Sequence, residues 1–150
     1  MSNKKPTSPF GLVGWREWVH LPDLGLQNIK AKIDTGARTS ALHAFSLEDF
    51  FDQGKHRIRF LIHPIQKNKE VVVQCEADII DQRLVTDSGG HSEERWVIRS
   101  HLVLGLFTWE IELTLTERDN MLFRMLLGRN ALKRRLVVNP SGSFLMSHEK

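Results

Sequence analysis

The sequence of 150 residues contains a single cysteine, Cys75, and no long hydrophobic run. One cysteine cannot form a disulfide within the chain, which agrees with a reducing compartment. No segment approaches the roughly 18 apolar residues that a membrane-spanning helix needs, so we expect no membrane contact. Residues Met1 to Pro9 lack the hydrophobic centre of a signal peptide, and we expect them to form a disordered lead-in. These absences together predict a cytoplasmic protein.

The sequence also lacks the short motifs of several enzyme classes. It has no HExxH motif and no paired cysteines, so its seven histidines form no recognisable zinc motif. It has no GxxxxGK[ST] loop, so nothing indicates ATP binding. We therefore expect no cofactor and no metal. Cys75 falls on one face of an expected strand, where a free cysteine is more often part of the core than a nucleophile.

The composition favours one globular domain over residues 10–150, because 41% of the residues are hydrophobic and 26% are charged. The net charge of +3 is too mild to indicate nucleic-acid binding. Six arginines in the second part of the chain allow two interpretations, a solvated surface of mixed charge or an electropositive groove that favours an acidic peptide. They are Arg83, Arg95, Arg99, Arg118, Arg124 and Arg129.

Alternation of apolar and polar residues predicts an all-β fold. The expected strands cover residues 10–21, 26–33, 57–63, 70–77, 107–116, 121–127, 136–138 and 143–146. Residues 42–51 fit a short helix or a strand, and residues 130–135 fit one short helix near the C-terminus. Many short strands separated by turns favour a closed or nearly closed barrel. The strand pair within about 57–77 is expected to be an extra hairpin added to that barrel.

One carboxylate follows a strand in an unusual setting. Ile29, Ala31 and Ile33 share one face of a strand, and the alternation stops at Asp34-Thr35-Gly36. Gly36 allows backbone angles and a close approach that a side chain would block. We call residues 34–37 the acidic loop. Its composition indicates a functional carboxylate, and the alternative is a turn residue that caps local amides.

A glycine pair, Gly89-Gly90, lies between two β-like segments, residues 78–85 and 95–104. This arrangement predicts a hairpin with residues 86–91 at its tip and with His91 and Arg95 near the tip or stem. Further along, the expected strand over residues 121–127 ends in Gly128.

Two of these segments carry a resemblance. Ile33 to Ala37 resembles the catalytic loop of aspartic proteases, and Leu126 to Asn130 resembles the second hallmark of their retropepsin branch. Over almost its whole length the chain is similar to small bacterial retropepsin-like proteins, which are often labelled ATP-dependent zinc proteases. Some of those are encoded beside a ligase that adds glutamates to a ribosomal protein. The similarity lies in Gly14 to Glu17, Asp34 to His43, Asp81 to Arg83, Thr86 to His91, Glu94-Arg95, Glu112 to Leu115 and Met125 to Asn130.

The resemblance implies a retropepsin-like barrel whose glycine-rich hairpin is a flap over the substrate. It implies an aspartic endopeptidase, and a single Asp-Thr-Gly makes a homodimer with paired Asp34 the natural arrangement. The implied substrate is a peptide or protein, acidic or polyglutamylated given the neighbouring ligase. The implied site consists of catalytic Asp34, Thr35 and Gly36, substrate-binding Ala37, Arg38, Asp87, Ser88, Gly89, Gly90 and His91, and supporting Leu126, Leu127, Gly128, Arg129 and Asn130.

Two departures from the simplest pattern affect these expectations. Asp87-Ser88-Gly89 also fits the acidic motif, but a chain this short cannot hold two lobes with a loop, a flap and a supporting strand each. Retropepsins commonly carry an acidic partner for Arg129 at the position of Arg38. Arg129 must therefore find another partner, and we expect Arg38 to line the cleft and bind an acidic side chain of the substrate.

Two other functions stay open at this stage. A non-catalytic peptide-binding module could use the same barrel, because folds outlast functions. A zinc-dependent hydrolase is the third candidate, for which His43 near the acidic loop and His91 in the hairpin could meet. Scattered histidines are more often surface or hydrogen-bonded residues than ligands.

Overall fold

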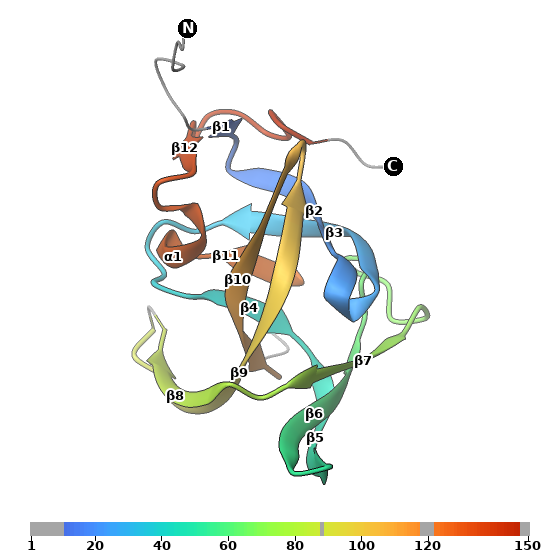
Figure 1. The fold of residues 1–150 in the computed structure, drawn as a ribbon. Coiled ribbons are helices and arrows are strands. Elements are labelled where there is room, and N and C mark those ends of the chain that lie inside the picture. Colours follow the sequence, from blue (N-terminus) through green and yellow to red (C-terminus); the bar gives the residue numbers. More distant parts are fainter. Residues whose placement is uncertain (1–10, 88, 118–121, 148–150) are drawn as a thin grey trace, which may run out of the picture.

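The computed structural model describes residues 11–87, 89–117 and 122–147 and is almost entirely built of strands (Figure 1). The N-terminal strands are β1 (Gly11–Val13), β2 (Arg16–Leu21), β3 (Leu26–Ile33), β4 (Ser40–His43), β5 (Phe45–Asp52) and β6 (Lys55–Ile62). The later strands are β7 (Val73–Asp78), β8 (Asp81–Thr86), β9 (Ser92–Leu104), β10 (Phe107–Thr116), β11 (Met125–Leu127) and β12 (Leu136–Val138). A 3-10 turn, η1 (Pro22–Leu24), and a short helix, α1 (Arg129–Leu132), complete the fold.

Six strands close into a barrel in the order β10, β4, β11, β3, β2 and β9, and β9 pairs back with β10. The closing pair is antiparallel and runs from Phe107 opposite Leu104 to Thr114 opposite Val97. Two pairs, β10 with β4 and β11 with β3, are parallel. The predicted all-β fold, a closed barrel with one short helix, is confirmed.

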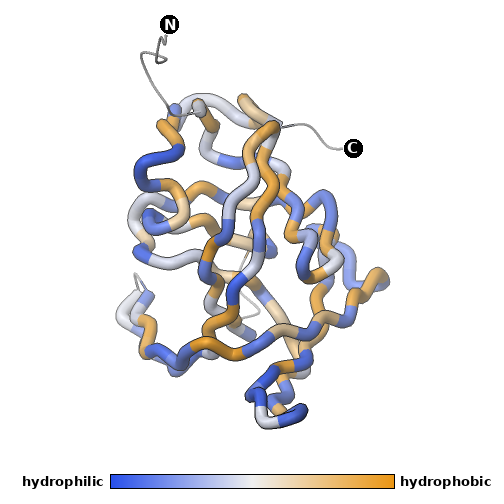
Figure 2. The backbone as a smooth tube through the Cα atoms, in the orientation of Figure 1, coloured by the Kyte–Doolittle hydropathy of each residue, from blue (hydrophilic) through white to orange (hydrophobic). Residues whose placement is uncertain are grey.

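Hydrophobic and hydrophilic residues alternate along the strands (Figure 2), and a set of the hydrophobic residues forms the buried core. Ile29, Ala31 and Ile33 are buried as predicted, and so are the inward residues of β6, Ile58, Phe60 and Ile62. Cys75 is also buried. Burial of this alternating set supplies most of the stability of such a fold, at roughly 25 cal/mol for each Å² of apolar surface.

A three-stranded sheet, β5-β6-β7, is attached to the barrel, and we call it the appended sheet. The predicted extra hairpin corresponds to β6 and β7, which pair from Arg57 opposite Asp78 to Ile62 opposite Val73. The ambiguous residues 42–51 form strand, divided between β4 in the barrel and β5 in the appended sheet. Cys75 donates a hydrogen bond from Sγ to the carbonyl oxygen of Leu24, 3.4 Å away, which ties this sheet to the barrel.

Several predicted boundaries were wrong. The single strand over residues 10–21 is broken at Gly14, where a Cβ atom would lie 2.2 Å from the Gly142 carbonyl oxygen. The strand over 121–127 begins only at Met125, and the helix over 130–135 is α1, which ends before Arg134 adopts a positive φ of 66°. Phe107 is 41% exposed because it lies at the open end of β10. The expected lead-in, Met1 to Pro9, lies outside the described residues.

The predicted strand over residues 143–146 is absent, and a buried carboxylate explains why. Glu17 of β2 is fully buried and accepts hydrogen bonds from the amides of Gly14 (2.7 Å) and Leu145 (2.8 Å). It also accepts from the Ser147 hydroxyl at 2.6 Å and from the amides of Met146 and Ser147. The amides of the C-terminal segment therefore bind one side chain instead of a strand ladder. Within the described parts of the chain, no helix has the length and apolarity to cross a membrane.

Candidate functional site

The acidic loop begins where β3 leaves the barrel wall. The Asp34 amide donates to the Leu127 carbonyl oxygen (2.8 Å), so the loop starts from the adjacent strand β11. The loop then turns tightly, with the Ala37 amide 3.2 Å from the Asp34 carbonyl oxygen. The Gly36 amide donates to Oδ1 of Asp34 (3.1 Å). Asp34 is half-buried, and its carboxylate is oriented by the loop that carries it.

Residues 127–130 hold the acidic loop from the other side. The amides of Arg129 and Asn130 donate to the carbonyl oxygens of Ala37 (2.8 Å) and Arg38 (3.0 Å). A Cβ atom on Gly128 would lie 2.5 Å from the Thr39 carbonyl oxygen, so only glycine permits this approach. Leu127 and Gly128 are buried beneath the loop, as a supporting role requires.

Arg129 binds a partner other than the acidic side chain that is common at position 38 in retropepsins. Its Nη1 atom donates to the carbonyl oxygens of Thr35 (3.0 Å) and Gly36 (3.1 Å). The guanidinium therefore binds the backbone of the acidic loop instead of an acidic side chain, although Arg129 itself is exposed. Arg38 takes part in the support of the loop through its carbonyl oxygen, which accepts from the Asn130 amide.

A cleft of about 1300 Å³ separates the acidic loop from the β8–β9 hairpin. It brings together residues that are far apart in the sequence, from the loop, the hairpin and the end of β11. The predicted site residues that line it are Asp34, Gly36, Ala37, Arg38, Asp87, Gly89, His91, Leu126, Arg129 and Asn130. Thr35 and Gly90 are exposed but do not line the cleft, and Ser88 lies outside the described residues.

The tip of the hairpin is shaped by Asp87. Its Oδ1 atom accepts hydrogen bonds from the amides of Gly89 and His91, both at 2.9 Å. The backbone closes the same turn, because the Asp87 amide donates to the His91 carbonyl oxygen (2.8 Å). The hairpin predicted from the glycine pair is therefore present, with Thr86 opposite Ser92 at the last strand pair. Asp87 contributes to the site by folding the tip.

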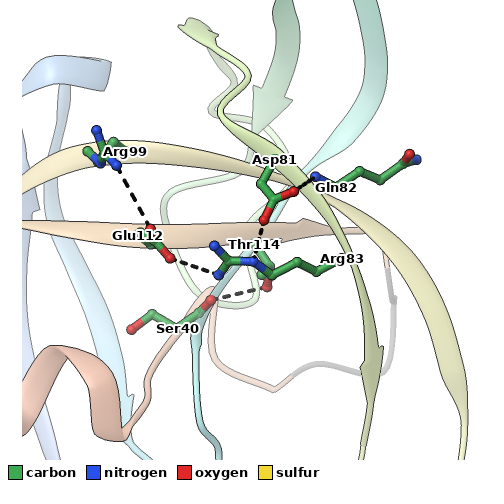
Figure 3. A network of polar contacts seen from close by, with 7 residues as sticks. All are labelled: Ser40, Asp81, Gln82, Arg83, Arg99, Glu112 and Thr114. Carbon is green, nitrogen blue, oxygen red and sulfur yellow. Dashed lines mark hydrogen bonds and ion pairs between the residues drawn. The ribbon is translucent and has the colours of Figure 1, made fainter.

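A polar network forms one wall of the cleft, and sequence analysis did not assemble it (Figure 3). Arg83 of β8 donates to Asp81 (2.7 Å) and, from Nη1, to Glu112 of β10 (2.8 Å). Hydrogen bonds from Arg83 and from the Gln82 amide hold the pKa of Asp81 below its ordinary value. The hydrogen bond to Glu112, and then the bond to Asp81, raise the pKa of Arg83 further. The alternation of Glu110, Glu112, Thr114 and Thr116 along β10 was the available signal.

A second, buried part of this network reaches the support of the acidic loop. Arg95 of β9 donates to Glu93 (2.6 Å) and to Oγ1 of Thr114 (3.3 Å). Thr114 donates in turn to the Ser40 carbonyl oxygen (3.1 Å). The Ser40 hydroxyl accepts from the Gly128 amide, also at 3.1 Å. Hydrogen bonds therefore connect Arg95 in the hairpin stem to Gly128, which lies beneath the acidic loop.

Three cations of the cleft have no acidic partner among the described residues, and one of them, Arg129, is bound to backbone carbonyl oxygens. Lys32 and Arg38 line the cleft, both are exposed, and neither forms an ion pair there. Arg83 and Arg95, by contrast, are paired with acidic side chains of their own. The positive charge available to a ligand therefore lies beside the acidic loop, where it favours an anionic group.

We also asked whether the described residues could hold a metal ion. In the part of the chain that the structure describes, no three His, Cys, Asp or Glu side chains gather in a group that could hold one. His91 is exposed at the hairpin tip, 3.6 Å from Asp87, and His43 is buried at the end of β4. The groups that this cleft offers for chemistry are carboxylates, backbone amides, arginines and a lysine.

Known proteins share this fold and sequence. Residues 12–149 match the model of a family described as RimB-like, retropepsin-like aspartic endopeptidase. A crystal structure of a protein of unknown function from Legionella pneumophila superposes with a TM-score of 0.75 and is 26% identical. The similarity covers 91% of this chain and 98% of that chain.

Longer proteins contain the same domain. Two proteins named probable alpha-L-glutamate ligase, from Shewanella pealeana and Shewanella halifaxensis, are each 44% identical over 138 residues, or 92% of this chain. A third, from Parasynechococcus marenigrum, is 49% identical over 132 residues. The chain spans only 30% of the length of the Shewanella relatives. The match of nearly every residue to the family model shows that this chain belongs to the RimB-like family of retropepsin-like aspartic endopeptidases.

Proposed function

We propose that this chain is an aspartic endopeptidase that works as a homodimer with one Asp34 contributed by each subunit. The observation that carries the proposal is the position of Asp34, which lines a large cleft and lies on a loop held by backbone hydrogen bonds. In aspartic proteases as a class, two carboxylates about 3 Å apart share one proton. One takes a proton from water and the other donates to the peptide carbonyl oxygen. A second copy would supply the missing carboxylate.

The β8–β9 hairpin supports this proposal because it forms the opposite side of the cleft. We infer that it acts as a flap that covers the substrate and excludes water. Gly36, through its amide, orients the Asp34 carboxylate, and Thr35 holds the loop through its carbonyl bond to Arg129. Asp34 is the catalytic residue in this scheme, and the other residues position it.

For the substrate we propose an acidic, glutamate-rich peptide. Lys32 and Arg38 support it because each can pair with a substrate carboxylate without breaking an existing ion pair within the described residues. The relatives named glutamate ligases support it as well, since a domain carried with such a ligase would meet chains that contain added glutamate. We place the protein in the cytoplasm, which its single thiol favours.

The central test uses Asp34→Asn and mixed dimers. Asp34→Asn should lower turnover of a glutamate-rich peptide by at least about a hundredfold while peptide binding is kept. If wild type and variant are co-expressed in equal amounts and pair at random, roughly one quarter of the dimers keep two aspartates. Activity per total protein should then fall to about one quarter. A fall to one half would show that each chain works alone and would overturn the dimer.

The same experiment separates the enzyme from a binding module. A module that only binds peptide shows no hydrolysis in the wild type, and its affinity is unaffected by Asp34→Asn. For the substrate class, Arg38→Ala should weaken cleavage of acidic peptides more than cleavage of neutral peptides. Lys55→Ala is the control, because it removes one positive charge from the exposed first residue of β6, outside the cleft. Equal losses on both peptides would count against acidic recognition by Arg38.

A further inference from the structure

The outer strand of the hairpin is a direct continuation of the appended sheet. Figure 1 shows β7 running on into β8, with only Ile79 and Ile80 between them. The Ile79 amide donates to the His56 carbonyl oxygen in the appended sheet (2.9 Å). The next amide, that of Ile80, donates to the Val97 carbonyl oxygen in the barrel, also at 2.9 Å. Two consecutive residues are therefore bonded into different sheets, at the base of the hairpin.

His56 contacts this junction with its ring as well as with its backbone. The ring meets Trp96 edge to face, with centroids 5.2 Å apart and an interplanar angle of 85°. On its other side it stacks on Phe51 at 4.5 Å and 5°. Its Nε2 atom lies 2.8 Å from Oδ2 of Asp49, which fixes the ring plane. Phe51, His56 and Trp96 thus form an aromatic column from β5 to the hairpin strand β9.

Trp96 lies inside the hairpin, because it is paired in register with Gln82 of β8. Among the described strands, β8 pairs with β9 and with no other. Apart from this ladder, its position over the cleft depends on side-chain contacts at its base. The Arg83–Glu112 pair holds it from the barrel strand β10, and the column through His56 holds it from the appended sheet.

We propose that His56 is a positioning residue for the flap, and that the appended sheet sets through it how closely the β8–β9 hairpin covers the cleft. The mechanical part of this inference is independent of the chemistry at Asp34, whereas its consequence for catalysis rests on the proposed function. An edge-to-face aromatic contact contributes enough to shift a local opening equilibrium by about three- to tenfold. Removal of the ring should populate a more open hairpin.

The test compares His56→Ala with His63→Ala. His63 is a matched control because it also stacks on a phenylalanine, Phe45, at 4.3 Å and 17°, close to the end of β6. Its contacts, to Phe45 and to the Val71 carbonyl oxygen, lie outside the hairpin. His56→Phe is the rescue variant, since it keeps an aromatic ring and loses the bond to Asp49.

The readout is hydrogen–deuterium exchange of the amides in residues 81–86 and 92–97 of the whole protein. We expect exchange about three- to tenfold faster in His56→Ala, no change in His63→Ala, and near wild-type exchange in His56→Phe. Unchanged exchange in His56→Ala, equal increases in both alanine variants, or failure of His56→Phe to restore protection would each overturn the proposal. Where the wild type hydrolyses peptide, His56→Ala should raise KM with little change in kcat. A wild type without hydrolysis would contradict the endopeptidase and leave the exchange result decisive for His56.

Discussion

The Arg129 guanidinium donates to the Thr35 carbonyl oxygen at 3.0 Å, so the first residue of α1 binds the loop that carries Asp34. Lysine at position 129 keeps the charge, but its ammonium lies on a flexible stem and lacks the fixed donor geometry with which Nη1 binds both carbonyl oxygens. We expect Arg129→Lys to lower kcat by about tenfold or more through a displaced Asp34. Because Arg129 is exposed, the unfolding free energy should change by only about 1 kcal/mol. Steady-state kinetics and urea unfolding measure the two effects, and a large stability loss with normal kcat would contradict this role.

The hydroxyl of Ser40 accepts a hydrogen bond from the buried Gly128 amide. Removal of this hydroxyl should therefore lower the unfolding free energy by more than the loss of an ordinary hydrogen bond does. Ser40→Ala leaves that buried N–H without an acceptor, and we expect a loss of about 1–3 kcal/mol. Ser100→Ala is the control, since Ser100 is also buried but its hydroxyl donates to the carbonyl oxygen of exposed His101. Chemical denaturation of both variants gives the comparison, and equal losses would show that the Gly128 amide finds another partner.

The carboxylate of Glu17 holds the C-terminal segment in place, because both of its oxygens accept hydrogen bonds from that segment. Glu17→Gln replaces one oxygen by an NH₂ group that cannot accept from Met146 and Ser147, so several buried donors lose their partner. We expect a loss of about 3 kcal/mol or more in unfolding free energy. The same change at exposed Glu48 should alter stability by less than about 0.5 kcal/mol. Limited proteolysis after residue 140 should accelerate in Glu17→Gln alone.

Burial raises the pKa of the Cys75 thiol to about 12. In the unfolded chain the thiol ionises near its ordinary pKa of 9.0, so unfolding releases a proton once the pH exceeds that value. The contribution of Cys75 to stability is therefore complete below pH 9 and is lost as the pH rises from about 9 towards 12. Urea unfolding between about pH 8 and pH 10 should show this fall in wild type and a smaller one in Cys75→Ala. Alkylation of the folded protein at pH 8 should be slow until denaturant is added.

Sequence reasoning succeeded where the period of two dictates burial. Ile29, Ala31 and Ile33 required a strand with one buried face, and that strand necessarily delivers Asp34 at its end. It failed at residues 143–146, because the apolar Phe144-Leu145-Met146 run gives no sign that its amides bind the carboxylate of Glu17. Local pattern specifies which residues face inward, while a long-range side-chain acceptor is invisible to it.

The sequence predicted the loops of the candidate site but not the polar side chains that form the wall of its cleft. Asp34, Gly128 and the hairpin tip have local signatures, whereas Arg83 and Glu112 meet only because β8 and β10 both pair with β9. The partner of Arg129 could not be predicted either, because every residue has a backbone carbonyl and the sequence does not show which one accepts a bond. The extent of the acidic-peptide preference of Arg38 stays a prediction.

The parallel pairing of β1 with β12 sets Gly11 opposite Leu136, and the side chain of Met146 lies against Gly11 as well. Both ends of the described chain thus reach one corner of the barrel, whereas the cleft lies at the hairpin end of β9. In a longer polypeptide, connections to the two ends of this domain can therefore lie side by side without covering the cleft. This placement of the ends agrees with the occurrence of a similar sequence in the ligase relatives, of whose length this chain spans 30%.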